Sequence, residues 1–178
     1  MSSTKSKVPA LLNEQVTKEF YSAYLYLSFA NYYEEKGLKG FENWFRVQAQ
    51  EERDHALLFI DFMHQNDMPV TLESIDQPKA VDDKLIAPLK EALKHEKYVT
   101  SLIHNIYAAA SEEHDFRTMQ FLDWFVKEQA EEEDRARTNI QRMELFGSDA
   151  KALYDLDQEL QARTYAAPTL VIGGGTAA

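Results

Sequence analysis

The positions of glycine and proline constrain the fold of this chain more than any other feature. The 178 residues hold six glycines and five prolines, and these fall in clusters between long stretches that contain neither. Since both residues interrupt helices, this spacing is typical of helix boundaries rather than of closely spaced strand turns. The pattern predicts an all-α protein.

The longest of these stretches predict four long helices. They are expected between Pro9 and Gly37, over 41–65, over 88–112, and from the break at His114-Asp115 to Phe146. A connection of about 20 residues before Pro88 can travel the length of a bundle, so the third helix should start at the opposite end. The chain is therefore predicted to form a four-helix bundle with a long crossover between helices two and three.

The ends of the chain complete the expected organisation. Ser148 can cap a short fifth helix, and Pro168 with three consecutive glycines indicates a loose end. We expect a flexible N-terminus over residues 1–8, the bundle over 9–146, the short helix over 148–164 and a loose tail over 165–178.

Composition excludes several classes of protein. A formal net charge of −11 argues against a nucleic-acid partner, which usually requires a basic surface. The absence of cysteine excludes disulfides, zinc fingers and thiolate-bound iron, so any metal must bind oxygen and nitrogen. No apolar run is long enough for a signal peptide or a membrane span, so we expect a cytoplasmic protein without a membrane partner.

The apolar stripe of each long helix is interrupted by an ionisable side chain. At alternating spacings of three and four, the four stripes contain Glu19, then Glu52 with His55, then Glu96, and finally Glu132 after Gln129. A carboxylate in an apolar interior is costly unless it is paired or binds a metal. Four such residues at similar depth predict one shared site.

For one helix taken alone, a carboxylate that faces solvent is at least as good an interpretation as a buried ligand. A stripe assigned one residue off would turn Glu19 to solvent, and an isolated Glu-x-x-His occurs often by chance. Glu52 and His55 lie three apart on one helix face, however, and can reach the same ion. Tyr26 lies two turns after Glu19, where core packing is the commoner role and a buried hydroxyl would need a partner. The other histidines lie off the stripes and are expected on the surface; they are His64, His95, His104 and His114.

In order and spacing, these residues resemble the non-haem bacterial ferritins from about Leu12 to Leu160. The resemblance rests on Asn13-Glu14-Gln15, Glu19-Phe20-Tyr21-Ser22, Ala49-Gln50-Glu51-Glu52-x-x-His55, Glu96, and Trp124-Phe125-x-x-Glu128-Gln129-x-Glu131-Glu132-Glu133. It implies an iron-storage ferroxidase with a ferritin-like bundle, in which 24 identical subunits form a hollow shell.

The resemblance also implies a role for each matching residue. Glu19, Glu52 and His55 are similar to one iron position, with Glu52 bridging to a second position at Glu96 and Glu132, beside Gln129 and near Tyr26. A third iron would bind at Glu51, Glu128, Glu131 and Glu132, although the first three could equally form a solvated acidic face.

The ligand pattern departs from that of neighbouring families. The fourth helix offers Gln129-x-x-Glu132 where a symmetric site would have a second Glu-x-x-His. This difference favours ferritin over bacterioferritin. Glu52-Arg53-Asp54-His55 also lacks the methionine through which bacterioferritins bind haem, so no haem is expected.

The expected chemistry is oxidation of Fe(II) by O₂ or H₂O₂. Carboxylates stabilise Fe(III) more than Fe(II), and two neighbouring irons can each give one electron to the same oxidant. Two alternatives remain open: a di-iron oxygenase would need an apolar substrate pocket beside the metals, and a purely structural subunit should have uninterrupted apolar stripes.

Overall fold

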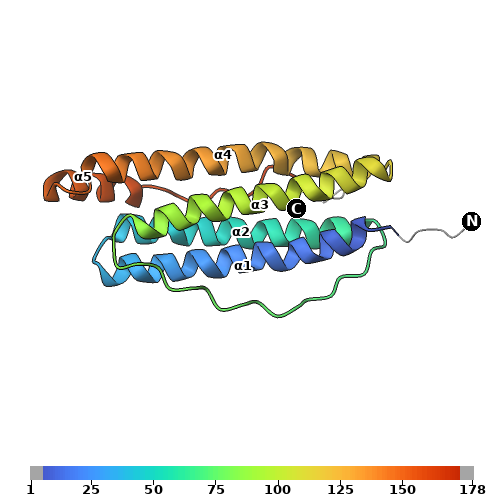
Figure 1. Ribbon diagram of the computed structural model, residues 1–178, viewed down its shortest axis with the longest axis horizontal. Coiled ribbons are helices and arrows are strands. Elements are labelled where there is room, and N and C mark those ends of the chain that lie inside the picture. Colours follow the sequence, from blue (N-terminus) through green and yellow to red (C-terminus); the bar gives the residue numbers. More distant parts are fainter. Residues whose placement is uncertain (1–5, 173–178) are drawn as a thin grey trace, which may run out of the picture.

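The computed structural model describes residues 6–172, which form an elongated bundle of helices (Figure 1). Over that range every regular element is helical, which confirms the all-α prediction. The helices are α1 (Val8–Glu35), α2 (Lys39–Gln65), α3 (Ala87–Glu112), α4 (Phe116–Phe146) and α5 (Ala150–Gln161). None of these helices is long and apolar enough to cross a membrane.

The helix ends follow local sequence chemistry. Pro9 and Pro88 stand in the first turns of α1 and α3, and Gly37 takes a φ of +74° in the turn between α1 and α2. Asp115 caps α4 by accepting a hydrogen bond of 3.1 Å from the backbone N–H of Thr118. The expected cap of α5, Ser148, is wrong: Asp149 is the cap, because the helix begins one residue later than a Ser148 cap requires.

The bundle consists of two antiparallel hairpins joined by a long crossover. α1 packs on α2 and α3 packs on α4, while residues 67–86 run beside α1 from one end of the bundle to the other (Figure 1). α3 therefore starts at the end where α2 starts, and the two helices run parallel. This arrangement is the predicted four-helix bundle with a crossover between helices two and three.

Helix α5 docks on the start of α2 through a buried carboxylate. Asp157 Oδ1 accepts hydrogen bonds from the backbone N–H groups of Gly40 at 2.8 Å and Phe41 at 3.0 Å. These N–H groups belong to the first turn of α2, where a negative charge is favourable. A Cβ atom on residue 40 would lie 1.6 Å from the Asp157 carbonyl oxygen, so this contact requires glycine.

Residues 162–172, which we call the C-terminal strap, return along the bundle between α2 and α4. The Tyr165 hydroxyl bonds to Asp54 on α2, and Trp124 Nε1 on α4 donates to Thr169 Oγ1 at 3.0 Å. Leu170 packs on the core beyond them. The strap thus differs from the expected loose tail over 165–172, because its partners lie more than 40 residues away in sequence; 173–178 lie outside the described residues.

The start of the chain is held as well. The backbone N–H of Lys7 donates to Glu113 at 2.8 Å, and Val8 is already buried in the core as the first residue of α1. Helical structure therefore begins inside the segment 1–8 that was expected to be flexible, whose first five residues lie outside the described range.

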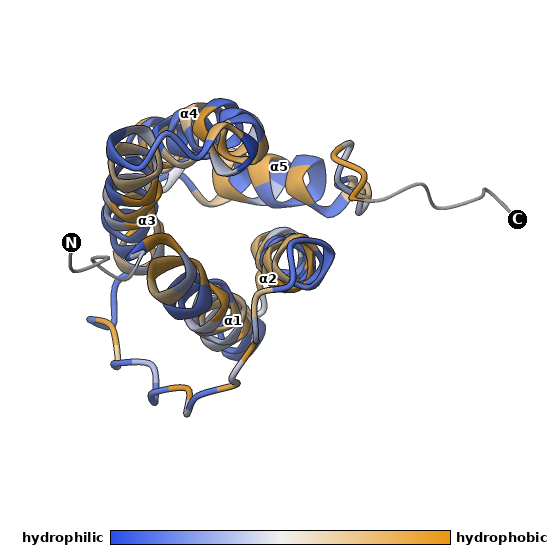
Figure 2. Ribbon diagram, turned by 90° about the vertical axis from the view of Figure 1, so that its right-hand side faces the viewer, coloured by the Kyte–Doolittle hydropathy of each residue, from blue (hydrophilic) through white to orange (hydrophobic). Residues whose placement is uncertain are grey.

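Two separate apolar clusters form the core. The first surrounds Tyr33 and Phe45 toward the α5 end, and the second surrounds Phe59 and Phe125 toward the opposite end. In the end view the apolar faces turn inward and the polar faces outward (Figure 2). Between the two clusters the interior is polar, and this layer contains most of the residues singled out from sequence.

Candidate metal centre

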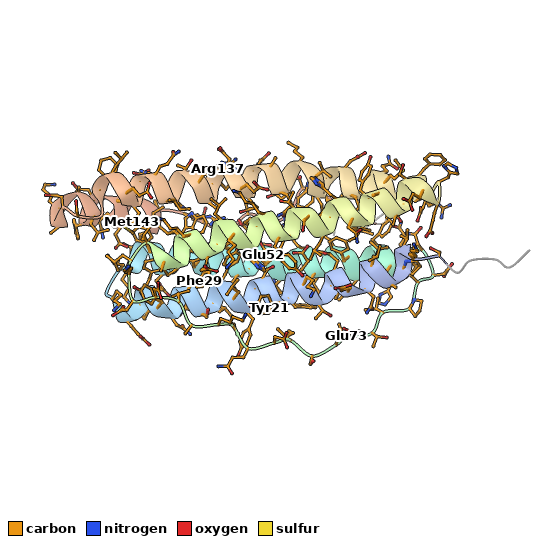
Figure 3. All side chains as sticks on the ribbon, in the orientation of Figure 1. Tyr21, Phe29, Glu52, Glu73, Arg137 and Met143 are labelled. Carbon is orange, nitrogen blue, oxygen red and sulfur yellow. The ribbon has the colours of Figure 1, made fainter. Side chains whose placement is uncertain are left out.

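The polar layer lies near the middle of the bundle, where Figure 3 labels Glu52. Each of the four long helices contributes a buried carboxylate to it, through the stripe residues predicted from sequence. The buried carboxylates are Glu19, Glu52, Glu96 and Glu132, accompanied by buried His55 and Gln129.

Glu19, Glu52 and His55 converge on one point. One ligand atom from each lies within 4.8 Å of the other two. Gln15 Nε2 donates to Glu19 at 2.7 Å from one turn earlier on α1 and orients that carboxylate. Oε2 of Glu19 and Oε1 of Glu52 are buried without a hydrogen-bond partner among the described residues. Since buried carboxylate oxygens nearly always have partners, these two side chains suit a bound cation.

Glu96 is also buried, among polar side chains that hold it in place. It accepts hydrogen bonds from the Tyr26 hydroxyl and from Gln129 Nε2, the latter at 3.1 Å. Glu132 is bonded by Gln48 Nε2 at 2.6 Å and by Arg135 at 2.7 Å. Within residues 6–172, neither Glu96 nor Glu132 joins the convergent group of three, although both lie close enough to raise the pKa of Glu52.

Burial and mutual repulsion favour the protonated form of these acids. Burial is the main cause that raises the pKa of Glu19 to about 8, with the Glu52 charge adding to it. Burial followed by the Glu132 charge raises the pKa of Glu96 to about 8. The same two causes, with Glu96 as the leading charge, raise the pKa of Glu52 well above its usual range. Without a cation, the layer therefore holds protons at neutral pH.

The three outer carboxylates are more accessible and are paired with arginines. Glu51 contacts Arg163 at 2.5 Å, while Arg135 lies 3.6 Å from Glu128 and 3.2 Å from Glu131. Glu51 and Glu128 are half-buried and Glu131 is exposed. The structure brings them beside Glu132 without forming a group that converges as closely as the inner three do.

Four supporting residues were given no role in the site from sequence. Gln15 could have been found from its spacing of four before Glu19, and Gln48 lies on the predicted stripe of α2. Arg135 is one turn from both Glu131 and Glu132, so its ion pairs are local. Arg163 reaches Glu51 from 112 residues away, and no local pattern indicates that contact.

His95 is not the surface residue that the sequence predicted. It is half-buried, and its Nε2 lies 2.8 Å from the Ser22 hydroxyl, with the Tyr26 ring edge-on at 6.1 Å. Burial lowers the pKa of His95 to about 4, so the ring is neutral at pH 7. The residue precedes Glu96 and turns toward Ser22 on α1, outside the apolar stripe of its own helix. The other three predicted surface histidines are exposed.

Comparison with known proteins gives the family. The model of the ferritin-like domain matches residues 9–146, which cover the four long helices except for Val8 and include every predicted ligand. The chain belongs to the ferritin family. A bacterial non-heme ferritin of Staphylococcus epidermidis is 33% identical over 156 residues, covering 88% of this chain and 94% of that protein. Its counterpart in Staphylococcus aureus is 32% identical over 154 residues, covering 86% and 93%.

Solved ferritin structures agree closely with this fold. An engineered closed form of the Archaeoglobus fulgidus ferritin superposes with a TM-score of 0.88 at 43% identity, covering 92% of this chain and all of that one. The open-pore ferritin of the same archaeon gives a TM-score of 0.87 at 43% identity, with the same coverage. The family resemblance drawn from the motifs is thereby confirmed.

Proposed function

We propose that this chain is the subunit of an iron-storage ferritin and that its polar layer oxidises Fe(II) to Fe(III). One observation carries the proposal: Glu19 and Glu52, which converge with His55, each have a buried carboxylate oxygen without a hydrogen-bond partner among residues 6–172. A purely structural bundle would gain stability by replacing these groups with apolar ones. Family membership supports iron as the cation, and an oxygen-rich ligand set with one imidazole suits iron.

The proposed ligands divide between two iron positions. Glu19, Glu52 and His55 bind the first, and Glu52 bridges to the second at Glu96 and Glu132. Gln129 and Tyr26 orient Glu96 through the hydrogen bonds that they donate to it. Because Gln129 and Tyr26 are neutral donors, the negative charge of Glu96 remains available to bind the ion.

The reaction balances with these residues as ligands and proton carriers. Two Fe(II) ions give up two electrons, which reduce O₂ to H₂O₂ or H₂O₂ to water with the uptake of two protons. The carboxylic acids of the layer release protons when they bind iron, so the protons needed arise beside the reacting ions. Paired one-electron transfers avoid the release of a radical.

A third iron is proposed at the outer carboxylates Glu51, Glu128 and Glu131, together with Glu132. These side chains are more accessible than the inner ones and lie on the α2 and α4 side of the layer. An ion that leaves the inner pair could therefore pass through this outer site without crossing the apolar clusters.

Storage requires a shell, and the surface is consistent with assembly into 24 subunits. Large apolar side chains are exposed at the ends of the bundle, including Phe116 and Leu145, each with 71% of its surface exposed. Contact with other copies would remove this apolar surface from water. The neighbouring structures are ferritins described by their pores, which supports a hollow assembly for this chain as well.

Aerobic addition of Fe(II) to the pure apoprotein tests the proposal. The wild type should develop the absorbance of Fe(III) rapidly and remain soluble with many irons per subunit, without any organic co-substrate. Glu52→Ala and His55→Ala should lose the fast phase while still assembling, because each removes a ligand but leaves both apolar clusters intact. Glu73→Ala, at an exposed carboxylate on the crossover, is the matched control.

Two results would contradict the proposal. Fast oxidation retained in Glu52→Ala would place the chemistry elsewhere. Oxidation that proceeds only with an organic substrate would favour an oxygenase.

A further inference from the structure

Arg163 is held more firmly than Arg135 at the outer cluster, by which we mean the carboxylates Glu51, Glu128 and Glu131. Its guanidinium lies 2.5 Å from Glu51, donates to Gln48 Oε1 at 2.9 Å and to the Trp44 carbonyl at 3.2 Å, and stacks on the Trp44 ring at 4.6 Å. Only 18% of its side chain is exposed, compared with 42% for Arg135. Arg163 is therefore fixed by several partners, as in a built cation site.

The position of Arg163 in the chain links this cation to the C-terminal strap. Its carbonyl accepts a hydrogen bond of 2.9 Å from Asn43 Nδ2, and Tyr165 follows at Asp54. The next polar contact is that of Thr169 with Trp124. Arg163 thus makes the largest group of polar contacts that the strap forms with the bundle.

Arg163 also reaches a proposed iron ligand through a single side chain. Gln48 accepts from Arg163 through Oε1 and donates from Nε2 to Glu132 at 2.6 Å. The guanidinium therefore fixes the orientation of the Gln48 amide, since an amide turned over would present its NH₂ group to the arginine. Arg163 is in this sense a positioning residue for Glu132.

We propose that Arg163 is a tethered counter-cation of the outer cluster, and that an ion bound at Glu51 displaces it and frees the strap. The inference rests on the proposed function for the identity of the ion. An ion with two or three charges at Glu51 would face the guanidinium across one carboxylate, and their repulsion in a half-buried setting is strong. Binding of an ion at the third site then weakens the attachment of the strap, and attachment of the strap weakens binding of the ion.

Arg135 provides the internal contrast. It pairs with Glu128, Glu131 and Glu132 from the same helix, so it can swing into solvent without any movement of the backbone. Displacement of the Arg163 guanidinium instead removes its contacts with Glu51, Gln48 and Trp44, and leaves the Asn43 and Tyr165 contacts to hold the first part of the strap. Of these two arginines, Arg163 is the one whose displacement by a bound ion would change the conformation of the chain.

Titration of Zn(II) into the assembled apoprotein, followed by hydrogen exchange, tests the coupling without redox chemistry. The exchange of residues 164–172 should stay unchanged while the inner pair fills and should rise when the third equivalent binds. Glu128→Gln, which removes an outer carboxylate, should suppress that rise. Calorimetry on the same samples gives the number and affinity of the sites.

Substitution of Arg163 tests the competition directly. Arg163→Gln removes the competing charge and should tighten the third Zn(II) by about tenfold or more, which is the scale of one lost charged hydrogen bond. The strap should exchange rapidly in this variant even without metal. Arg142→Gln is the matched control, because Arg142 pairs with Glu159 on α5, away from the cluster.

The outcomes separate this inference from the proposed function. It is overturned if the third Zn(II) binds without faster exchange of the strap, or if Arg163→Gln leaves the third affinity unchanged. Equal Zn(II) binding by wild type and Glu52→Ala would instead remove the inner site on which the proposed function depends. Even in that case, the coupling between the outer site and the strap would stand if Arg163→Gln tightened a Zn(II) site that Glu128→Gln abolishes.

Discussion

Metal binding to the apoprotein should release protons in a number that follows from the burial of its acids. Glu19 and Glu96, each with a pKa raised to about 8, are about nine-tenths protonated at pH 7, and burial raises the pKa of Glu52 well above its usual range. Ligation requires all three as carboxylates. Filling the inner pair at pH 7 should therefore release about two to three protons per subunit.

Calorimetric titration of Zn(II) in two buffers of different ionisation enthalpy measures this number. The released protons bind the buffer, so the difference in observed heat gives protons per site. Glu19→Gln should lower the total by about one, because it removes one raised pKa and keeps the shape of the side chain. Glu73→Gln, at an exposed carboxylate, should leave the number unchanged.

The sign of the pH dependence follows from the same shifts. Because the pKa values are raised, protons compete with the metal up to about pH 8, and affinity should rise between pH 6 and pH 8 and level off above. Heats that are the same in both buffers, or an affinity that falls as the pH rises, would refute the view that the empty layer is held neutral by protons.

Three further predictions concern assembly, docking and the orientation of a ligand. Light scattering on purified protein should give one large species of about 24 subunits, and a stable monomer or dimer alone would count against a shell. Gly40→Ala should destabilise the protein by about 3 kcal/mol or release α5, since its Cβ would overlap the Asp157 carbonyl, and thermal melting with exchange over α5 measures both. Tyr26→Phe should cost about 1–3 kcal/mol and slow Fe(II) oxidation, because Glu96 loses a buried donor; unchanged melting and unchanged rates would show that this hydrogen bond is not needed.

Sequence periodicity was sufficient for the buried carboxylates because helix geometry alone decides which side chains face inward. Glu19, Glu52, Glu96 and Glu132 each interrupt an otherwise apolar row, and all four are buried. The boundaries of the four long helices followed from local residues such as Pro88 and Asp115 and lie within two residues of their predicted places, whereas α5 ends at Gln161, three residues before the predicted 164.

Contacts between distant segments could not be predicted in the same way. Arg163 and Glu51 have no periodic relation, and the strap was expected to be loose because its partners on α2 and α4 are remote in sequence. His95 was misplaced because its neighbour Glu96 occupies the inward position, and only the three-dimensional packing of α1 on α3 brings Ser22 to the imidazole. Helix periodicity predicts whether a side chain points into the core, but it does not predict which distant residue that side chain contacts.

The division of the core into two apolar clusters separates the tasks of folding and chemistry along the length of the bundle. Phe45 and its neighbours stabilise one end, and Phe59 and its neighbours stabilise the other, so the middle is free to hold groups that a continuous core would reject. A chain of this design can lose the polar layer proposed for catalysis to apolar substitutions and still fold, even gaining stability. Resistance to heat is therefore no sign that such a bundle remains active.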